Sequence, residues 1–429
     1  TPLSQNQQTA RDQIYNRELR KLRKKQQQTM APSYSFGAKK PNYSSLALLK
    51  TDSTTEATQQ SKSVSLKILK LGLTANNTFY LRFGDKDPFN FFQCYPVDST
   101  SQLVHEESAS LDDFVHPPAW GIAQVEDSTV DEIVVGTKFL GHLPIGTRVT
   151  FRDVSVNEEG NMIVNRPKVD SAYNVFRKID PDDALLTEGY GDLALVCWPG
   201  IITGFGCYST LQKKEFYGAD NLVITSASSK VALALAFYLK DSGKNVIGYT
   251  SKSNIQFCES TGLYSQILDY DADLDPEKRY VFIDIVGRSD IYSKNKSCVI
   301  KLIAIGNTVG ATGKDVTFGL FPPFATLKFL LTILGAPRWT RSWMNPVHEL
   351  YLVLDAHEEL KEDWGVAKYK TLLKEGTHRF CQSATQWMTI HKCDTENTIK
   401  KGFADVIDGK VAPSEAVILD VLMATKEIV

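Results

Sequence analysis

Short apolar runs alternate with longer mixed stretches between about residues 197 and 335, and this alternation is the most regular pattern in the chain. Each run is rich in Val, Ile, Leu or aromatic residues and is typical of a buried strand. The stretches between them have the length and pattern of helices, so we expect a parallel sheet with helices on both faces. The predicted strands are residues 222–225, 246–249, 266–269, 280–286 and 299–305.

The segments on either side of this region have different patterns. Residues 64 to about 195 contain short alternating strands between Gly and Pro turns, which predicts a β-rich domain of barrel or sandwich type. The last segment, 336–429, is mixed and has helical patterns at 347–359 and 365–374. It ends in AVILDVL, which has the pattern of a strand that returns to the β-rich domain.

The first 62 residues are rich in Gln, Ser, Thr, Lys and Arg and poor in apolar residues, so we expect a tail that does not fold alone. Within it, residues 12–28 have the spacing of a helix that would be marginally stable in water. The predicted parts are a basic arm, a GroES-like β-rich domain, a Rossmann-like nucleotide-binding domain and a C-terminal segment that rejoins the β-rich domain. They span residues 1–62, 63–196, 197–335 and 336–429.

Composition narrows the class of protein. Apolar residues make up 42% of the 429 residues, which is enough for two or three domain cores, and no apolar stretch reaches the roughly 18–20 residues of a membrane span. The seven cysteines are scattered and never spaced C-x-x-C, which indicates reduced thiols. No N-terminal stretch has the apolar core of a secretory signal, so we expect a cytoplasmic protein.

A nucleotide site is predicted where the strand at 222–225 passes into the next helix. The turn residues Ser226 to Ser229 are small enough for a pyrophosphate to reach the first N–H groups of the helix, where the helix dipole favours an anion. Lys230, directly after the turn, could pair with the pyrophosphate or face solvent. The turn contains no glycine and so lacks the G-x-G-x-x-G pattern, and the alternative is an ordinary turn that binds nothing.

The end of the following strand bears on the choice of nucleotide. An Asp or Glu there would bind the ribose of NAD, whereas Thr250, Ser251 and Lys252 suit a 2′-phosphate and predict NADP. Asp284 and Asn307 follow later strands, where each could contact the ligand or form a turn. The candidate cofactor-binding residues are Thr225, Ser226, Ser228, Ser229, Lys230, Thr250, Ser251, Lys252 and Asn307.

Five segments carry a family resemblance. They are NNTFYLRFGDKDPFNFFQCYP (76–96), AWGIAQVEDS with VGTKFLGHLP (119–144), TSASSKVALALAF (225–237), YTSKSN (249–254) and GLYSQILDY (262–270). In this order they resemble the zinc-free, quinone-reductase-like branch of the medium-chain dehydrogenase/reductase superfamily, and most closely a domain family of unknown function within it. The resemblance covers roughly residues 64–429 and implies a GroES-like domain, then a Rossmann domain, with a C-terminus that rejoins the first.

The resemblance implies reduction of an enone or a quinone by a hydride from NADPH, with a side chain that donates to the substrate oxygen. The segment NNTFYLRFG resembles the active-site strand of the quinone reductases, and it offers Tyr80 as the donor with Asn77 and Arg82 nearby. Tyr80 could equally be a strand tyrosine that only packs. We expect no metal, because Cys94 lies among aromatic residues and His116 is followed by two prolines.

Charge separates the arm from the body and raises a second hypothesis. Residues 1–62 carry a net charge of +7 and the remainder carries −9. A basic arm on an acidic body suits a polyanion, so the alternative function is a non-catalytic factor that binds RNA, with the ribosome as the natural partner. A solvated tail or a targeting segment are the other interpretations of the arm. The candidate RNA-binding residues are Arg17, Arg20, Lys21, Arg23, Lys24 and Lys25.

Deletion of residues 1–30 tests the RNA hypothesis. If the arm binds RNA, the full-length protein should sediment with ribosomes at low salt, and the deletion should abolish this. Binding to a single-stranded target should weaken with salt, with a slope of log K against log salt of about −0.7 per phosphate contact. Sedimentation of both proteins over a salt series measures this. A full-length protein that never sediments with ribosomes excludes the hypothesis.

Overall fold

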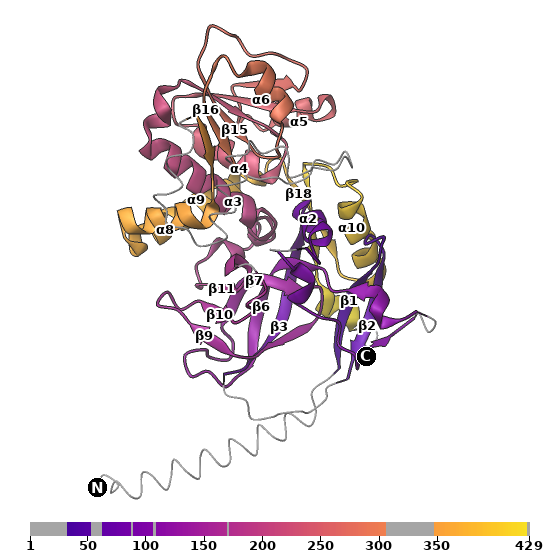
Figure 1. Cartoon of the computed structure of the whole chain (residues 1–429). Coiled ribbons are helices and arrows are strands. Elements are labelled where there is room, and N and C mark those ends of the chain that lie inside the picture. Colours follow the sequence, from indigo (N-terminus) through magenta and orange to yellow (C-terminus); the bar gives the residue numbers. More distant parts are fainter. Residues whose placement is uncertain are drawn as a thin grey trace, which may run out of the picture.

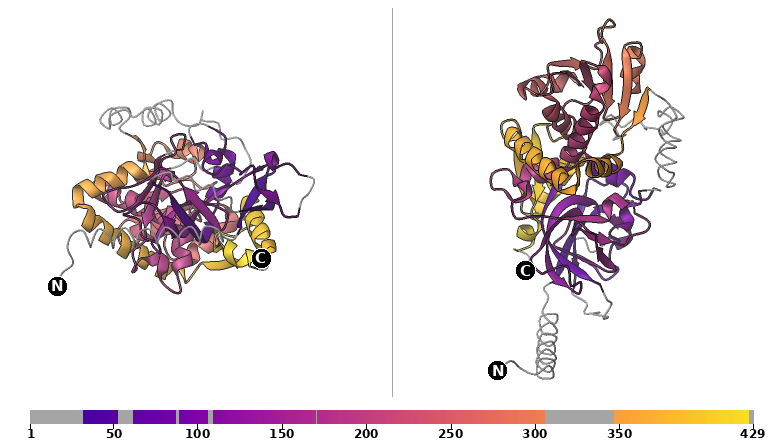
Figure 2. Two further views of the ribbon diagram at one scale, coloured as in Figure 1. Left: turned by 90° about the horizontal axis from the view of Figure 1, so that it is seen from below. Right: turned by 90° about the vertical axis from the view of Figure 1, so that its left-hand side faces the viewer.

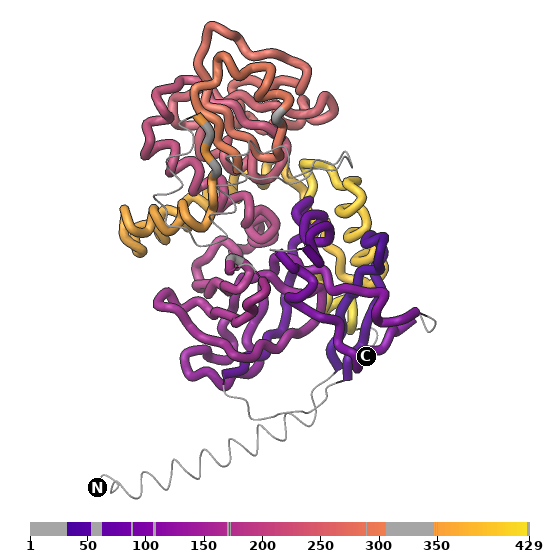
Figure 3. Tube along the Cα trace, viewed as in Figure 1, coloured from indigo at the N-terminus to yellow at the C-terminus, as the bar shows by residue number. Residues whose placement is uncertain are grey.

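The computed structural model describes residues 32–52, 62–86, 89–105, 109–169, 171–305 and 347–426. Figure 1 shows two bodies, a β-rich body in indigo and purple and an α/β body in magenta to orange. The C-terminal segment, in yellow, returns from the α/β body to the β-rich one, and this return can be followed along the trace in Figure 3. The expected combination of a GroES-like domain and a Rossmann fold is therefore confirmed.

The described part of the β-rich body is built on a nine-stranded, mostly antiparallel sheet. Its strand β3 (Val64–Leu73) alternates between buried and half-buried positions in its first half, because successive side chains of a strand point to opposite faces. β3 pairs with β6 (Pro118–Ser128), which pairs in turn with β7 (Lys138–Pro144). The other strands are β8 (Arg148–Phe151), β9 (Val154–Val156), β10 (Met162–Val164), β11 (Val175–Lys178), β18 (Thr389–Cys393) and β19 (Glu415–Leu419).

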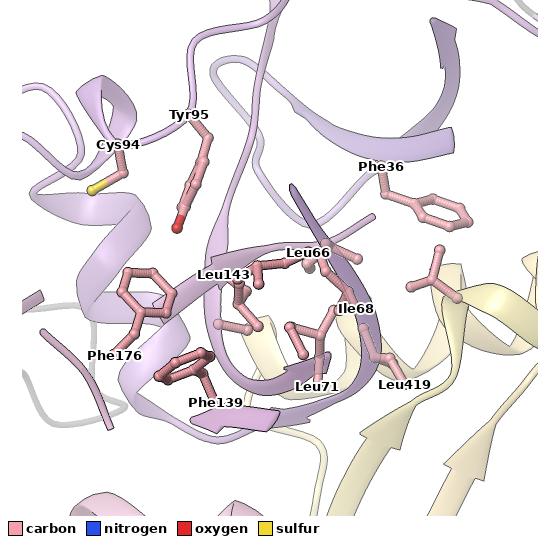
Figure 4. Packing of buried hydrophobic residues seen from close by; sticks show 14 of the residues in the cluster. Phe36, Leu66, Ile68, Leu71, Cys94, Tyr95, Phe139, Leu143, Phe176 and Leu419 are labelled. Carbon is pink, nitrogen blue, oxygen red and sulfur yellow. The ribbon is translucent and has the colours of Figure 1, made fainter. Parts of the chain in front are cut away.

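The first described strands correct the prediction of a tail over residues 1–62. β1 (Ser33–Lys39) and β2 (Leu46–Thr51) form an antiparallel hairpin. Phe36 is fully buried and belongs to the same hydrophobic core as Leu419, as Figure 4 shows. The hairpin folds because its apolar side chains pack on the rest of the chain. The surrounding residues are mostly polar, so the composition of the segment does not indicate these strands. β4 (Gln102–Leu103) and β5 (Phe114–Val115) complete this second sheet.

A parallel sheet forms the centre of the α/β body. Its described strands are β12 (Asn221–Ile224), β13 (Asn245–Thr250), β14 (Gln266–Asp269), β15 (Tyr280–Asp284), β16 (Val299–Ala304) and β17 (His348–Leu350). All five predicted strands are present, and their spatial order is β14-β13-β12-β15-β16-β17. Counted from β12, this is the order 3-2-1-4-5-6 of a doubly wound dinucleotide-binding fold. The helices that follow the strands are α4 (Lys230–Leu239), α5 (Ile255–Ser260) and α6 (Ser289–Asn295).

The C-terminal segment joins the two bodies. The prediction of a helix over 347–359 is wrong for its first residues, because the edge of the parallel sheet provides backbone partners there and β17 pairs with β16. The predicted returning strand is confirmed: β19 pairs antiparallel with β3 of the β-rich body. The helices of this segment are α8 (Val353–Trp364), α9 (Val366–Ala384), α10 (Glu396–Ile407) and α11 (Val421–Thr425).

The longest helix in the described residues, α3 (Gly191–Lys213), lies between the two bodies. A Cβ atom on its Gly204 would lie 2.7 Å from the backbone nitrogen of Leu235, so this glycine allows α4 to approach closely. α3 is long and apolar enough to cross a membrane, but 78% of its most apolar stretch is buried inside the protein. It is therefore a core helix.

Shorter helices connect these elements. They include α2 (Asn76–Arg82) and the 3-10 turns Phe91–Gln93, Leu111–Asp113, Ser171–Tyr173, Ala184–Leu186, Glu215–Gly218 and Lys252–Asn254. The predicted helix at 12–28 lies outside the described residues.

Substitution of Phe36 distinguishes a folded hairpin from a tail. Phe36→Ala should lower the free energy of unfolding by about 3–5 kcal/mol, because it removes a fully buried aromatic side chain. Ser45→Ala, at an exposed position of the same hairpin, is the control and should change it by less than about 0.5 kcal/mol. Urea unfolding measures both. Equal midpoints for the two variants would contradict the placement of β1 in the core.

Candidate functional site

The carboxyl ends of the parallel strands form one edge of the sheet, and this edge carries the candidate site. In such sheets a ligand binds in the crevice where the strand order reverses, which here lies between β12 and β15. The predicted cofactor-binding residues other than Asn307 lie in or directly after the ends of β12 and β13, so the fold gathers most of them at this edge. Asn307 lies outside the described residues.

A buried hydrogen-bond network forms the floor of the crevice. Thr225 follows β12 and donates from Oγ1 to Oδ1 of Asp284 over 2.8 Å, while its Oγ1 accepts from the N–H of Ile285 over 2.9 Å. Asp284 Oδ1 also accepts from the N–H groups of Gly287 and Arg288, each at 3.1 Å. Burial raises the pKa of Asp284, and these hydrogen bonds oppose the shift. Of the two roles predicted for Asp284, the structure favours that of a turn-forming residue.

The turn after β12 is tight although it contains no glycine. Ser226 has a φ of 55°, in the left-handed region that glycine adopts most easily. Ala227 is buried, and Ser229 caps α4 by accepting from the N–H of Ala232 over 3.2 Å. Small side chains therefore supply the compact shape that the sequence pattern predicts.

Hydroxyl groups tie the loop after β13 to this turn. Thr250 donates from Oγ1 to Oγ of Ser228 over 3.3 Å, and Asn254 donates from Nδ2 to the same oxygen over 3.1 Å. The Oγ atoms of Ser251 and Ser253 lie 3.0 Å apart and share a hydrogen bond. The structure thus brings together three of the predicted hydroxyl-bearing residues, Ser228, Thr250 and Ser251.

The two predicted cations have different surroundings. Lys252 is exposed after β13 and forms an ion pair with Asp271 across 3.1 Å, which raises the pKa of Lys252. Lys230 donates from Nζ to the carbonyl oxygen of Glu415 in β19 over 3.0 Å, and burial lowers its pKa. Lys230 therefore links the α/β body to the returning strand, and its ammonium group is committed there.

Tyr80 lies on a helix, which corrects the prediction of an active-site strand over NNTFYLRFG. Residues 76–82 form α2, and its buried residues are Asn77, Tyr80 and Leu81. These positions are spaced i, i+3 and i+4, which places them on one face of a helix. Figures 1 and 2 show α2 at the end of the β-rich body nearest the α/β body.

Tyr80 is buried in a cluster of aromatic rings. Nε1 of Trp120 donates to Oη of Tyr80 over 3.0 Å, and the ring of Phe91 packs 4.9 Å from that of Tyr80, centre to centre. The oxygen of Tyr80 accepts in this bond, so its own proton remains able to donate. Burial raises the pKa of Tyr80 far above its usual value, and the bond from Trp120 opposes this only in part. Tyr80 therefore keeps its proton at neutral pH.

Two members of this cluster are absent from the sequence prediction. Trp120 on β6 and His142 on β7 are directly paired across the two strands, and the ring centre of His142 lies 4.6 Å from that of Tyr80. His142 is fully buried, and neither of its ring nitrogens has a hydrogen-bond partner in the described part of the chain. Burial holds the pKa of His142 well below its usual value. The register between β6 and β7 brings these two rings together, and no local pattern in either strand indicates it.

The other two predicted catalytic residues have different contacts. Asn77 donates from Nδ2 to the carbonyl oxygen of Pro118 over 3.1 Å, and its Oδ1 accepts from the N–H of Thr74 over 2.9 Å. Both polar atoms of Asn77 are thus used within the protein. The guanidinium group of Arg82 lies 6.0 Å from the ring centre of Phe83, at the end of α2.

Cys94 and His116, which the sequence suggested as the nearest match to metal ligands, have other surroundings. Within the described ranges, no group of three or more His, Cys, Asp or Glu side chains could hold a metal ion. Cys94 is buried in the hydrophobic core, and Nε2 of His116 lies 3.0 Å from Oγ of Ser35. The candidate RNA-binding residues at 17–25 lie outside the described residues.

Comparison with known proteins adds a family and a fold. A sequence profile of the family described as "Protein of unknown function (DUF2855)" matches residues 71–412. No curated protein matches the sequence. The crystal structure of CurA from Vibrio vulnificus is similar with a TM-score of 0.50 and 14% identity, over 90% of this chain and 98% of the other. A mutant form of enoyl thioester reductase from Candida tropicalis gives a TM-score of 0.51 and 10% identity, over 91% of this chain and 100% of the other.

These likenesses extend over nearly the whole of each protein compared. They show that this chain has the two-domain fold of the medium-chain dehydrogenases/reductases. At such low identity they show the fold alone, and the chemistry must be argued from the site itself.

Proposed function

The chain belongs to the DUF2855 family, and we propose that it is an NADPH-dependent reductase of the medium-chain dehydrogenase/reductase type. The observation that carries this proposal is the switch point of a sheet in the order 3-2-1-4-5-6, with a tight, hydroxyl-bearing turn beside it. A dinucleotide binds across this point in doubly wound sheets. Within the superfamily we assign the chain to the zinc-free, quinone-reductase-like branch, and the burial of Cys94 in the hydrophobic core supports this assignment.

The residues at the crevice fit NADP. The pyrophosphate would lie at the turn of residues 226–229, where the side chains are small and α4 begins. The 2′-phosphate would lie beside Ser251 and Lys252, which offer a hydroxyl donor and a positive charge. Asp271 competes for Lys252, so it weakens the preference for NADPH over NADH without removing it. Lys230 is left out of this proposal because its ammonium group binds Glu415.

Tyr80 is the proposed donor to the substrate. Bound NADPH would supply a hydride to the carbon conjugated with the substrate carbonyl, and negative charge would develop on the carbonyl oxygen. The phenol of Tyr80 can donate a hydrogen bond to that oxygen and supply the proton that completes the reduction. Trp120 acts as a positioning residue, since its N–H fixes the oxygen of Tyr80. Of the rings around Tyr80, that of Trp120 is only partly buried, and it suits a planar apolar substrate such as an enone or a quinone.

Calorimetric titration with NADPH and NADH tests the cofactor. We expect tighter binding of NADPH, and Lys252→Ala should weaken NADPH about two- to fivefold and leave NADH unchanged, because an exposed charge contact is worth up to about 1 kcal/mol. Asp271→Asn is the matched change and should strengthen NADPH binding, because it releases Lys252. Absence of heat with both nucleotides, at concentrations that saturate a micromolar complex, would exclude the proposed reductase.

Tyr80→Phe tests the catalytic assignment. The variant lacks the phenol proton but keeps the ring, so turnover of a quinone or enone should fall by about 10²–10³. The affinity for NADPH should stay within twofold of the wild type, roughly the precision of the titration. Tyr43→Phe, in the β1–β2 hairpin, is the control and should retain full turnover. Equal turnover of Tyr80→Phe and the control would assign Tyr80 to packing alone.

A further inference from the structure

Side chains from two distant strands meet over the candidate nucleotide crevice. Tyr270 follows β14 and Arg288 lies in the loop after β15, and β13 and β12 stand between these strands. Neighbouring strands are about 4.8 Å apart, so β14 and β15 are separated by roughly 14 Å. The guanidinium carbon of Arg288 nevertheless lies 3.9 Å from the ring centre of Tyr270. Both side chains must therefore reach inward over the ends of β12 and β13.

A second contact holds Tyr270 down on the turn after β12. The side chain of Ser226 lies beside the hydroxyl of Tyr270, and Tyr270 is half-buried. Ser226 is the residue with the left-handed backbone in the predicted phosphate-binding turn. The ring of Tyr270 is thus fixed at one end by the turn and on its face by Arg288.

Arg288 is held in a fixed orientation. Its Nε and Nη2 donate to the two carboxylate oxygens of Asp290 over 2.9 and 2.7 Å, and its backbone N–H donates to Asp284. A guanidinium group that makes its hydrogen bonds along one edge leaves its flat face free to stack, and this face packs on the ring of Tyr270. The attraction of such a cation to a ring depends on the electrons of the ring face and would serve another aromatic ring equally well.

The position of this pair coincides with the place that a dinucleotide needs. In doubly wound sheets the adenosine half lies near the end of the second strand, which here is β13, and the pyrophosphate lies at the turn after the first strand, which here is β12. Tyr270 follows β14, on the far side of β13, and its side chain extends to the turn after β12. Its ring therefore occupies space that the adenosine half would need.

We propose that Tyr270 is an internal occupant of the adenosine part of the crevice, and that adenine displaces it and stacks on Arg288 in its place. The inference rests on the proposed binding of NADPH and adds to it the residue that binds adenine and the residue that competes with it. Arg288 exchanges one ring for another, so the cost of opening is the loss of the contact with Ser226 and of the packing of the Tyr270 ring on the hydrophobic core of the sheet. The apparent affinity is then the intrinsic affinity reduced by the fraction of molecules in which Tyr270 is displaced.

Titration of the full chain with adenosine 2′,5′-bisphosphate tests this proposal, because this probe carries the adenosine half and its 2′-phosphate without the nicotinamide. Tyr270→Ala should bind the probe and NADPH about 5- to 30-fold more tightly, because it removes the competing ring. Tyr270→Phe keeps the ring on Arg288 and loses only the contact of its hydroxyl with Ser226, so its gain should be smaller. Arg288→Ala should bind the probe more weakly than the wild type.

Two controls separate the possible outcomes. Reduced nicotinamide mononucleotide lacks the adenosine half, and its affinity should be the same in all variants. Tyr292→Ala removes a ring of α6 that packs beside Phe282 of β15, and it should leave binding of the bisphosphate unchanged. Thermal melting checks that each variant folds.

The results distinguish this inference from the proposed function. If the wild type binds NADPH and Tyr270→Ala binds it equally well or more weakly, Tyr270 is a ligand contact or a bystander and the inference is wrong, while the proposed function stands. If only Tyr270→Ala binds, Tyr270 is an occupant that keeps the crevice closed, which supports the inference and contradicts NADPH-dependent activity of the natural chain. If neither protein binds, both proposals are wrong.

Discussion

The hydrogen bond between Thr225 and Asp284 is the interaction on which the geometry of the site depends. At the switch point the chain leaves β12 and β15 toward opposite faces of the sheet, so the loops after these strands tend to diverge. A buried carboxylate that accepts from Thr225 and from the N–H groups of Gly287 and Arg288 holds the loops together. Because Thr225 and Asp284 are both buried, water cannot readily replace these bonds, and the edge has a defined shape. The same network positions Arg288 over Tyr270.

A second set of contacts determines how the two bodies sit together. Lys230 at the start of α4 binds the backbone of Glu415, and thereby attaches the predicted phosphate turn to the returning strand β19. On the other side, Glu159 in the turn after β9 binds Lys361 of α8 at 2.6 Å and Lys370 of α9 at 3.4 Å. Burial would raise the pKa of Glu159, but these two lysines lower it overall. The two bodies also share a hydrophobic core, in which residues of β6 and β7 pack with residues of α3 and α4.

The sequence predicted the parts of the fold that rest on local pattern. Strands β12, β13, β15 and β16 are mostly apolar, which is what burial on both faces of a parallel sheet requires. The β1–β2 hairpin was not predicted, because its apolar positions lie between polar stretches that dominate the composition of residues 1–62. Tyr80, predicted as the donor on a strand, lies on helix α2, and its catalytic role stays a prediction. The meetings of Trp120 with His142 and of Tyr270 with Arg288 depend on strand register and strand order, which no local window of sequence contains.

The insertion of β19 between β18 and β3 has a consequence for how the chain folds as it is synthesised. β3 precedes the α/β body along the chain and β19 follows it, so the sheet of the β-rich body stays incomplete while the whole α/β body is being made. During that interval β3 presents unpaired backbone groups on the side that β19 later covers, and such an edge is open to pairing with another chain. The β-rich body can thus be completed only after the α/β body has been synthesised.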